Sequence, residues 1–134
     1  MYFCVKGNIR GKQRPRFFKG HAYTPKETKD YEEHIRQSYY ERYYSKDIPP
    51  SNTRYKVVIT AVFRVPESWS KKKKEEALKQ KYCTKKPDTD NIIKIVLDAL
   101  NGIIYQDDKQ VVIVECKKYY DISEERLLIE VTEI

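Results

Sequence analysis

The segment Tyr55–Phe63 (YKVVITAVF) decides the fold, because valine, isoleucine and threonine dominate it and favour an extended chain. Apolar residues occupy both of its alternating faces, which is typical of a strand in the middle of a sheet. The turn-forming run Pro49–Asn52 precedes the segment and Pro66 follows it. The sequence therefore predicts a central strand that the other elements must cover.

Three further strands are predicted around this one. Tyr2–Lys6 is a short run of strand-forming residues, and Val111–Val114 and Arg126–Val131 are apolar runs near the C-terminal end. We expect the last two strands to pair with each other as a hairpin across a turn at residues 120–124.

The first predicted helix begins with Thr24 as N-cap and Pro25 in its first turn, and runs to about Tyr44. Glu27 follows Thr24 by three residues, which predicts a capping box. Tyrosines and Ile35 recur every three to four residues, so we interpret them as the buried side of the helix.

Two more helices are predicted after the central strand. The first is capped by Ser68 or Ser70 and ends near Lys81; the second starts at Asp88 or Thr89 and ends near Leu100. Together the elements predict an α+β fold in one domain of residues 1–134, with a mixed β-sheet packed against helices in the order β-α-β-α-α-β-β.

Nothing in the sequence resembles a signal peptide, and no apolar run approaches the roughly 20 residues that cross a bilayer. We therefore expect a cytoplasmic protein without a membrane partner. The three cysteines are far apart and odd in number, so we expect them to be reduced.

Charge is distributed unevenly along the chain. Residues 1–87 contain 22 Lys+Arg and 9 Asp+Glu, whereas residues 88–134 contain 5 and 11, within a net charge of +7. A basic body with an acidic centre suits a protein that attracts a polyanion and holds cations against it. Lysines that only keep the surface solvated would give the same net charge.

The basic residues near the N-terminus predict a contact with nucleic acid. They occupy a loop that contains glycine, proline and aromatics, which is a good phosphate-binding pattern, although a solvated loop is the alternative. A run of lysines at the start of the second helix is unfavourable, because the helix dipole is already positive at that end. A nucleic-acid contact and a solvated charge run explain these lysines equally well. The predicted DNA-binding residues are Arg10, Lys12, Arg14, Arg16, Lys19, Lys71, Lys72, Lys73, Lys74 and Lys86.

The acidic centre consists of Asp88 and Asp90 at the start of the third helix and of Asp107 and Asp108 before the next strand. If helix and strand pack together, these pairs can converge on one point. Carboxylate oxygens of this kind suit Mg²⁺ or Mn²⁺, which leave coordination sites for water and substrate phosphate. Lys94, one turn after Asp90, can stabilise the charge of a reacting phosphate.

The acidic residues have two other interpretations, a calcium-binding loop and a purely structural role. An EF-hand loop is excluded because Ile92 and Ile93 occupy positions that need a ligand and a glycine. A structural interpretation makes Asp88 and Asp90 helix-start acids and the Asp107–Asp108 pair turn formers. It explains each acid alone but does not explain Lys94.

Three motifs in the sequence resemble those of a known family. They are KPDTDNIIK (Lys86–Lys94), LDALNG (Leu97–Gly102) and DDKQV (Asp107–Val111). In this order they closely resemble the signature of RusA-type Holliday junction resolvases, which are often prophage-encoded. Arg14-Pro15-Arg16 and Tyr23-Thr24-Pro25 also resemble the N-terminal features of that family.

The resemblance implies a small homodimeric endonuclease that binds four-way junction DNA and makes paired nicks with Mg²⁺ or Mn²⁺, without a small-molecule organic cofactor. It implies Asp88, Asp90 and Asp108 as catalytic, metal-binding acids, Lys94 as the catalytic lysine and Asp107 as a supporting metal ligand. Two symmetric cuts need two equivalent sites, which a two-fold dimer supplies.

Two alternatives remain open from the sequence. The first is a branched- or single-stranded-DNA-binding protein that keeps the fold without the reaction. The second is a basic RNA-binding protein, which only the net charge favours.

Overall fold

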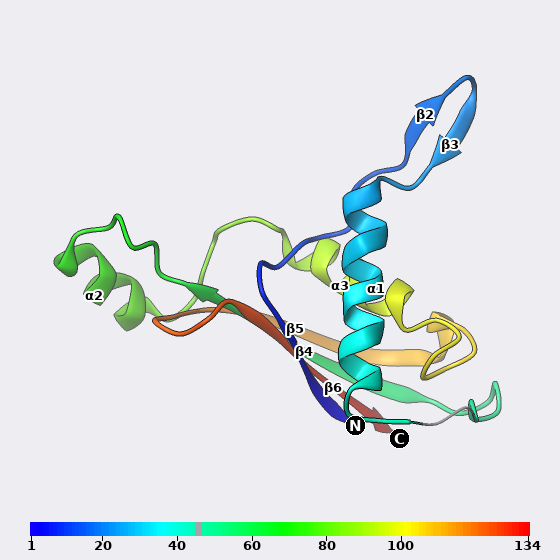
Figure 1. Ribbon diagram of the computed structural model, residues 1–134. Helices are drawn as coiled ribbons and strands as arrows, with labels where there is room; N and C mark the ends of the chain where they lie inside the picture. Colours follow the sequence, from blue (N-terminus) through cyan, green and yellow to red (C-terminus); the bar gives the residue numbers. More distant parts are fainter. Residues whose placement is uncertain (45–46) are drawn as a thin grey trace.

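The computed structural model describes residues 1–44 and 47–134 and shows an α+β fold, as predicted. Figure 1 shows a long sheet with helices on one side and a small hairpin that projects away from both. The described elements, in chain order, are β1 (Tyr2–Lys6), β2 (Arg16–Phe18), β3 (His21–Tyr23), α1 (Lys26–Tyr40), β4 (Tyr55–Arg64), α2 (Lys71–Gln80), α3 (Thr89–Ala99), the 3₁₀ helix η1 (Asp108–Gln110), β5 (Val111–Asp121) and β6 (Arg126–Glu133).

Strand β4 lies inside a four-stranded mixed sheet with the order β1-β6-β4-β5. It pairs parallel with β5 and antiparallel with β6, and β6 pairs antiparallel with β1. The predicted C-terminal hairpin is therefore wrong, because β4 lies between β5 and β6. In this arrangement β4, the most apolar strand, is hydrogen-bonded and buried along both of its edges. Residues 122–125 have to bridge only two strand spacings of roughly 4.8 Å each.

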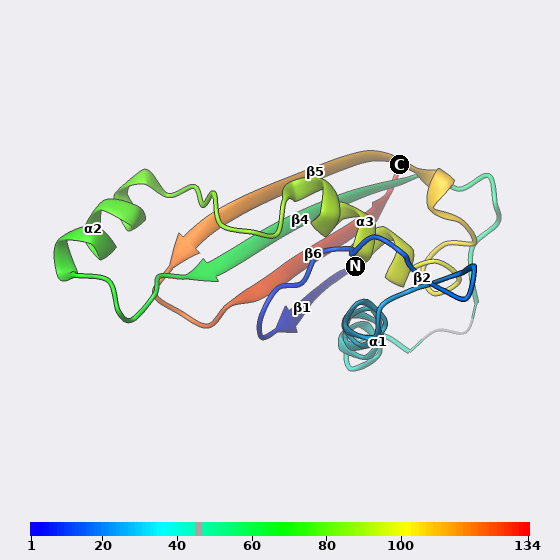
Figure 2. The ribbon, with the colours of Figure 1, turned by 90° about the horizontal axis from the view of Figure 1, so that it is seen from above.

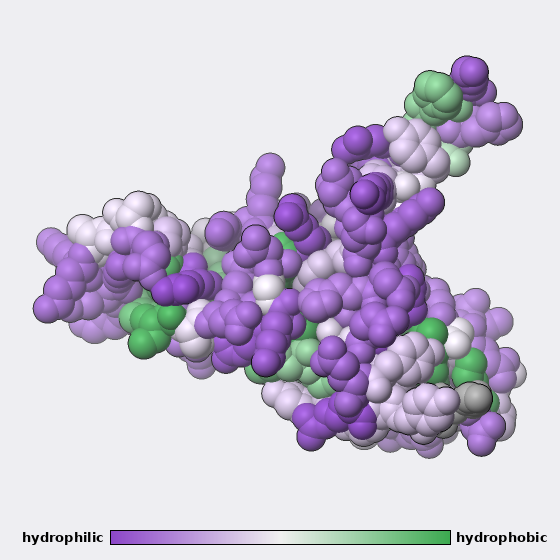
Figure 3. All heavy atoms as spheres, in the orientation of Figure 1, coloured by the Kyte–Doolittle hydropathy of each residue, from purple (hydrophilic) through white to green (hydrophobic). Residues whose placement is uncertain are grey.

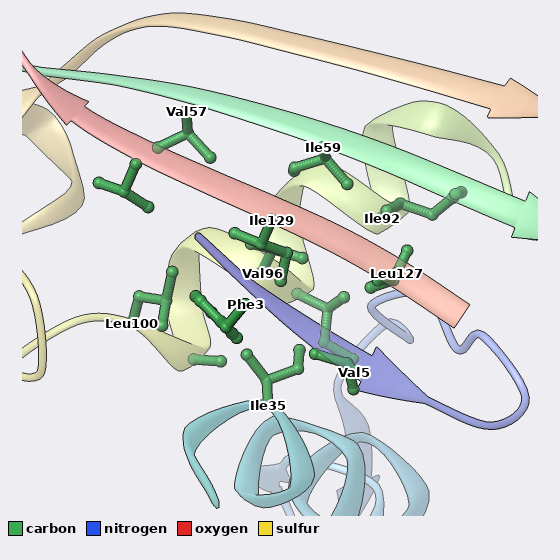
Figure 4. Close-up of a cluster of buried hydrophobic side chains, with 14 of the residues drawn as sticks. Phe3, Val5, Ile35, Val57, Ile59, Ile92, Val96, Leu100, Leu127 and Ile129 are labelled. Carbon is green, nitrogen blue, oxygen red and sulfur yellow. The ribbon is translucent and has the colours of Figure 1, made fainter. Parts of the chain in front are cut away.

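The core lies between one face of this sheet and the helices α1 and α3 (Figure 2). Val57 and Ile59 of β4 face Ile92 and Val96 of α3, and all four are fully buried (Figure 4). Ile35 of α1 closes the core above β1. Helix α3 is thereby held along its apolar stripe, and its polar side stays at the surface.

The start of helix α1 differs from the prediction, whereas the start of helix α2 agrees with it. Helix α1 starts at Lys26 with Pro25 as N-cap, and no side chain caps it, so the predicted capping box of Thr24 and Glu27 is wrong. The carbonyl oxygen of Pro25 accepts from the backbone N–H groups of Thr28 and Lys29, at 3.1 and 3.2 Å. Helix α2 has the predicted cap, since the Ser70 hydroxyl accepts from the backbone N–H of Lys73.

The predicted N-terminal loop contains a hairpin that sequence reasoning did not identify. Strands β2 and β3 pair across a two-residue turn, and they form a sheet of their own. Among the described residues, no helix is long and apolar enough to cross a membrane.

Candidate active site

The N-terminal end of α3 presents two carboxylates that its own backbone scarcely uses. Asp88 is the N-cap residue by backbone position, but its side chain makes no capping hydrogen bond. Asp90 accepts a hydrogen bond from the adjacent backbone N–H of Asn91 at 3.0 Å. Both acids are exposed, and so is Lys94 one turn further on. Asp88 and Asp90 thus occupy the helix-start positions that the structural interpretation gave them, although the Asp88 side chain forms no cap bond.

A loop from the N-terminal region crosses this end of α3 in close contact. The backbone N–H of Lys12 donates to the carbonyl oxygen of Asn91 at 2.9 Å. A Cβ atom on Gly11 would lie 2.7 Å from Cβ of Pro87 and 2.9 Å from Cβ of Asn91, which real side chains do not tolerate. Glycine is thus required for the loop to reach the acids.

This contact creates a hollow in which acids and bases meet. We call it the basic groove; it has a volume of about 820 Å³. Arg14 and Arg16 of the N-terminal loop and Lys94 of α3 line it together with Asp88 and Asp90. Its lining residues are Lys12, Gln13, Arg14, Pro15, Arg16, Asp88, Asp90, Asn91 and Lys94.

A second hollow of about 590 Å³ adjoins the groove and shares Asp88 and Asn91 with it. Arg10 and Lys86 line this second hollow. Four predicted DNA-binding residues, namely Arg10, Arg14, Arg16 and Lys86, therefore lie around Asp88.

Lys12 differs from these residues because its ammonium group is already paired. Its Nζ atom lies 3.0 Å from Glu32 of α1 and 3.1 Å from Asp98 of α3, and the side chain is only 18% exposed. Burial opposes the charged form, but the bonds to both carboxylates outweigh it and raise the Lys12 pKa. The ion pairs indicate that Lys12 fastens the loop to both helices, and its predicted DNA contact stays a prediction.

The other acidic pair lies at the C-terminal end of α3. The Asp107 carboxylate accepts from the backbone N–H of Lys109 at 2.8 Å, and the Gln110 side chain accepts from the backbone N–H of Asp107 at 3.1 Å. Together these bonds form a capping box at η1. Sequence reasoning placed a capping box at Thr24, where none exists, and missed this one.

Asp108 is a half-buried acid in the same place. Burial raises its pKa, the negative charges of Asp107 and Asp98 add to that rise, and a hydrogen bond with Asn101 opposes it. Asp108 thus neighbours Asp98, which follows Asp90 by two helical turns, or about 12 Å along the axis.

The expected convergence of both acidic pairs on one point is not seen. Within residues 1–44 and 47–134, no three Asp, Glu, His or Cys side chains are close enough to hold a metal ion together. Asp88 and Asp90 can offer two carboxylates and leave most coordination sites to water and phosphate, which fits Mg²⁺ or Mn²⁺. Asp108 contributes to a separate acidic region.

The lysine run is not part of the groove. Helix α2 lies at the opposite end of the sheet from the projecting hairpin (Figure 1). Lys73 lies over the Trp69 ring at 4.1 Å, and Lys74 pairs with Glu67 at 3.9 Å. A DNA contact of Lys71–Lys74 stays a prediction.

Comparisons with known proteins agree with the resemblance seen in the sequence. A family model described as endodeoxyribonuclease RusA matches residues 6–132, nearly the whole chain. A protein of Bacillus subtilis (strain 168) described as "Uncharacterized protein YqaN" is 48% identical over 66 residues. That match covers 48% of this chain and 46% of the relative, so it spans about half the length of each.

Proposed function

Because the chain belongs to the RusA family of endodeoxyribonucleases, we propose that it resolves four-way DNA junctions by paired nicks in opposing strands. The observation that carries the proposal is the basic groove, which is lined by two exposed acids and by Arg14, Arg16 and Lys94. The cationic side chains of such a groove attract a phosphate backbone, and its acids offer oxygen ligands.

Asp88 and Asp90 are the residues that would hold Mg²⁺ or Mn²⁺. A divalent cation bound there would lower the pKa of a bound water and screen the charge of the phosphate. We assign Asp108, with Asp107 in support, to cation binding at the opposite end of α3, on the strength of the family motif.

The remaining roles belong to the cationic side chains of the groove. Arg14 and Arg16 can each form bidentate hydrogen bonds with a phosphate, which fixes the position of the DNA strand relative to the acids. Lys94 lies one turn from Asp90 and would place a positive charge beside the phosphate under attack, where negative charge grows in the transition state.

We infer a two-fold dimer, which would supply a second equivalent site for the second nick. The outer edge of β5 supports it. Residues 81–83 cover this edge only beside Lys118 and Tyr120, and no described strand pairs with it along residues 111–117. Val112, Ile113 and Val114 are 53%, 44% and 38% exposed there. An unpaired apolar edge is a ready surface for strand pairing with a second copy.

A single substitution that introduces a charge can test the proposed dimer surface. Ile113→Lys should convert the dimer to a monomer in light scattering, because it places a charge at the pairing edge. Ile122→Lys is the matched control, since Ile122 is 68% exposed in the loop beyond the edge. Loss of the dimer in both variants, or in neither, would argue against β5 as the interface.

The separation of Asp108 from Asp88 favours a second candidate, a protein that binds branched DNA without cutting it. One experiment distinguishes the two. Purified protein is incubated with labelled four-way junction, linear duplex and flap DNA, with and without Mg²⁺. We expect nicks in opposing strands of the junction only with Mg²⁺. Binding to the junction without any cleavage would support the second candidate.

A further inference from the structure

The β2–β3 hairpin projects from the body of the protein beyond the end of α1 (Figure 1). Its turn is formed by Lys19 and Gly20, with φ of 50° and 78°. Two successive positive φ angles give the tight turn that matches the twist of a hairpin. All six strand residues are exposed, so the hairpin is not held by the core.

The hairpin carries aromatic side chains that are exposed to solvent. Phe17 is 75% exposed, Phe18 66% and Tyr23 45%. Figure 3 shows hydrophobic atoms beside hydrophilic ones on the projecting arm. The hairpin could form with polar residues at these positions, so exposed phenylalanines indicate a surface that is covered by a partner.

The charges around the aromatics identify the kind of partner. No acidic residue occurs between Met1 and Lys26. Within the part of the chain that the structure describes, Arg14, Arg16 and Lys19 form no ion pair, and the Lys19 ammonium lies 5.5 Å from the centre of the Phe18 ring. Unpaired cations on the same arm as exposed aromatic rings suit a polyanion that exposes flat apolar faces, and nucleic acid with accessible bases has both properties.

The position of the hairpin relates it to the basic groove. Arg16 is the first residue of β2 and also lines the groove, so Phe17 and Phe18 follow directly from a residue beside the acids. A strand bound by phosphate contacts in the groove would therefore bring its neighbouring bases to the hairpin. Fully paired duplex hides the faces of its bases, whereas the centre of a four-way junction interrupts their stacking.

We propose that the β2–β3 hairpin is a wedge that enters the open centre of a DNA junction, where Phe17 and Phe18 stack on bases at the branch point. This inference rests on the proposed function, and it assigns the preference for branched DNA to the hairpin. The acids of α3 then act on whichever phosphate the wedge has placed in the groove.

The test measures binding in EDTA, so it does not depend on cleavage. Dissociation constants are determined for a four-way junction and for a linear duplex of the same length. We expect Phe17→Ala/Phe18→Ala to weaken junction binding by roughly 5- to 150-fold, the range for one stacked base, and duplex binding by less than about 2-fold. A 2-aminopurine base at the branch point should change its fluorescence with the wild-type protein and not with this variant.

Two further variants distinguish base stacking from a general apolar contact. Phe17→Trp/Phe18→Trp keeps the aromatic faces and should keep junction preference, whereas Phe17→Leu/Phe18→Leu keeps apolar surface and should lose it. Full preference in the leucine variant, or loss of the dimer in light scattering of the alanine variant, would overturn the proposal in favour of a protein contact. Equal weakening on both DNAs would overturn it as well. A wild-type protein without junction preference would instead contradict the proposed function itself.

Discussion

The two ends of helix α3 carry similar acids in opposite situations. At the N-terminal end, Asp88 and Asp90 are exposed and line the basic groove. At the C-terminal end, Asp107 is engaged in the capping box of η1, and Asp108 is half-buried beside Asp98 and Asn101. At the N-terminal end both carboxylates are exposed, and among the described residues Asp90 accepts only the hydrogen bond from the adjacent Asn91 amide. At the C-terminal end one carboxylate caps η1 and the other is partly buried.

This difference makes the acids at the N-terminal end the more available for a cation, whereas Asp107 has a structural role as well. An exposed carboxylate without a cap bond costs the fold little to keep and little to lose, so it is available for a cation. A capping carboxylate stabilises the turn that carries it, so its loss should be felt in stability first. The variants below are chosen to act at one end of the helix and not at the other.

The largest effect is expected for Asp90→Asn. Nicking of a four-way junction with Mg²⁺ should fall by more than the roughly 10- to 100-fold that removal of an outer-shell partner typically costs. Junction binding in EDTA should persist, because the arginines of the groove remain. Undiminished nicking by this variant would remove the N-terminal acids from the reaction.

Gly11→Ala should produce the largest loss of stability. The new Cβ would meet Pro87 and Asn91 below 3.0 Å, so the loop must shift away from α3 at a cost of about 1–3 kcal/mol. Thermal and urea unfolding measure this loss, and junction binding should also weaken because the basic side of the groove moves. An unchanged Tm would show that the loop contact does not hold the groove together.

Asp107→Ala should cost about 1 kcal/mol, since it removes the acceptor of the Lys109 N–H bond. Asp107→Ser is the matched control, because serine caps as well but carries no charge. If both variants unfold like wild type, Asp107 is not a structural acid; if serine restores stability but nicking is lost, its charge belongs to the reaction.

The smallest effect is expected for Asp108→Asn, and it should depend on pH. Burial raises the Asp108 pKa above the ordinary value of 3.8, so the folded state disfavours the ionised form. The resulting penalty is absent below pH 3.8, develops as pH rises through the folded pKa, and is complete at neutral pH. The variant should therefore be more stable than wild type at pH 7 and equal to it near pH 3. Unfolding measured at both values tests this, and a destabilised variant at pH 7 would contradict it.

The sequence predicted the elements better than their arrangement. Tyr55–Phe63 was identified as the central strand because its apolar, β-branched pattern is local and unambiguous. The pairing of β6 with β4 was missed, because chain proximity favours a hairpin and only competition for the edges of β4 decides otherwise.

At the site, Asp88 and Asp90 lie at the start of a helix as predicted. The expected convergence with Asp107 and Asp108 is not seen among the described residues, and the roles of these acids stay predictions. Spacing along a chain cannot show that Asp108 lies near Asp98, which is about 12 Å along the helix axis from Asp90. Gly11 was missed because its need for glycine comes from a contact with Pro87 and Asn91, although a glycine within a basic loop is a signal of close approach.

The most direct test of the central claim is a titration with Mn²⁺ followed by amide NMR signals. The paramagnetic ion broadens the signals of residues nearest to it. Because the exposed acids at the N-terminal end of α3 are the more available for a cation, we expect amides of residues 88–91 to be broadened at lower Mn²⁺ than those of residues 107–110. We expect Asp90→Asn to remove this effect. Broadening that begins at residues 107–110, or survives unchanged in Asp90→Asn, would contradict it.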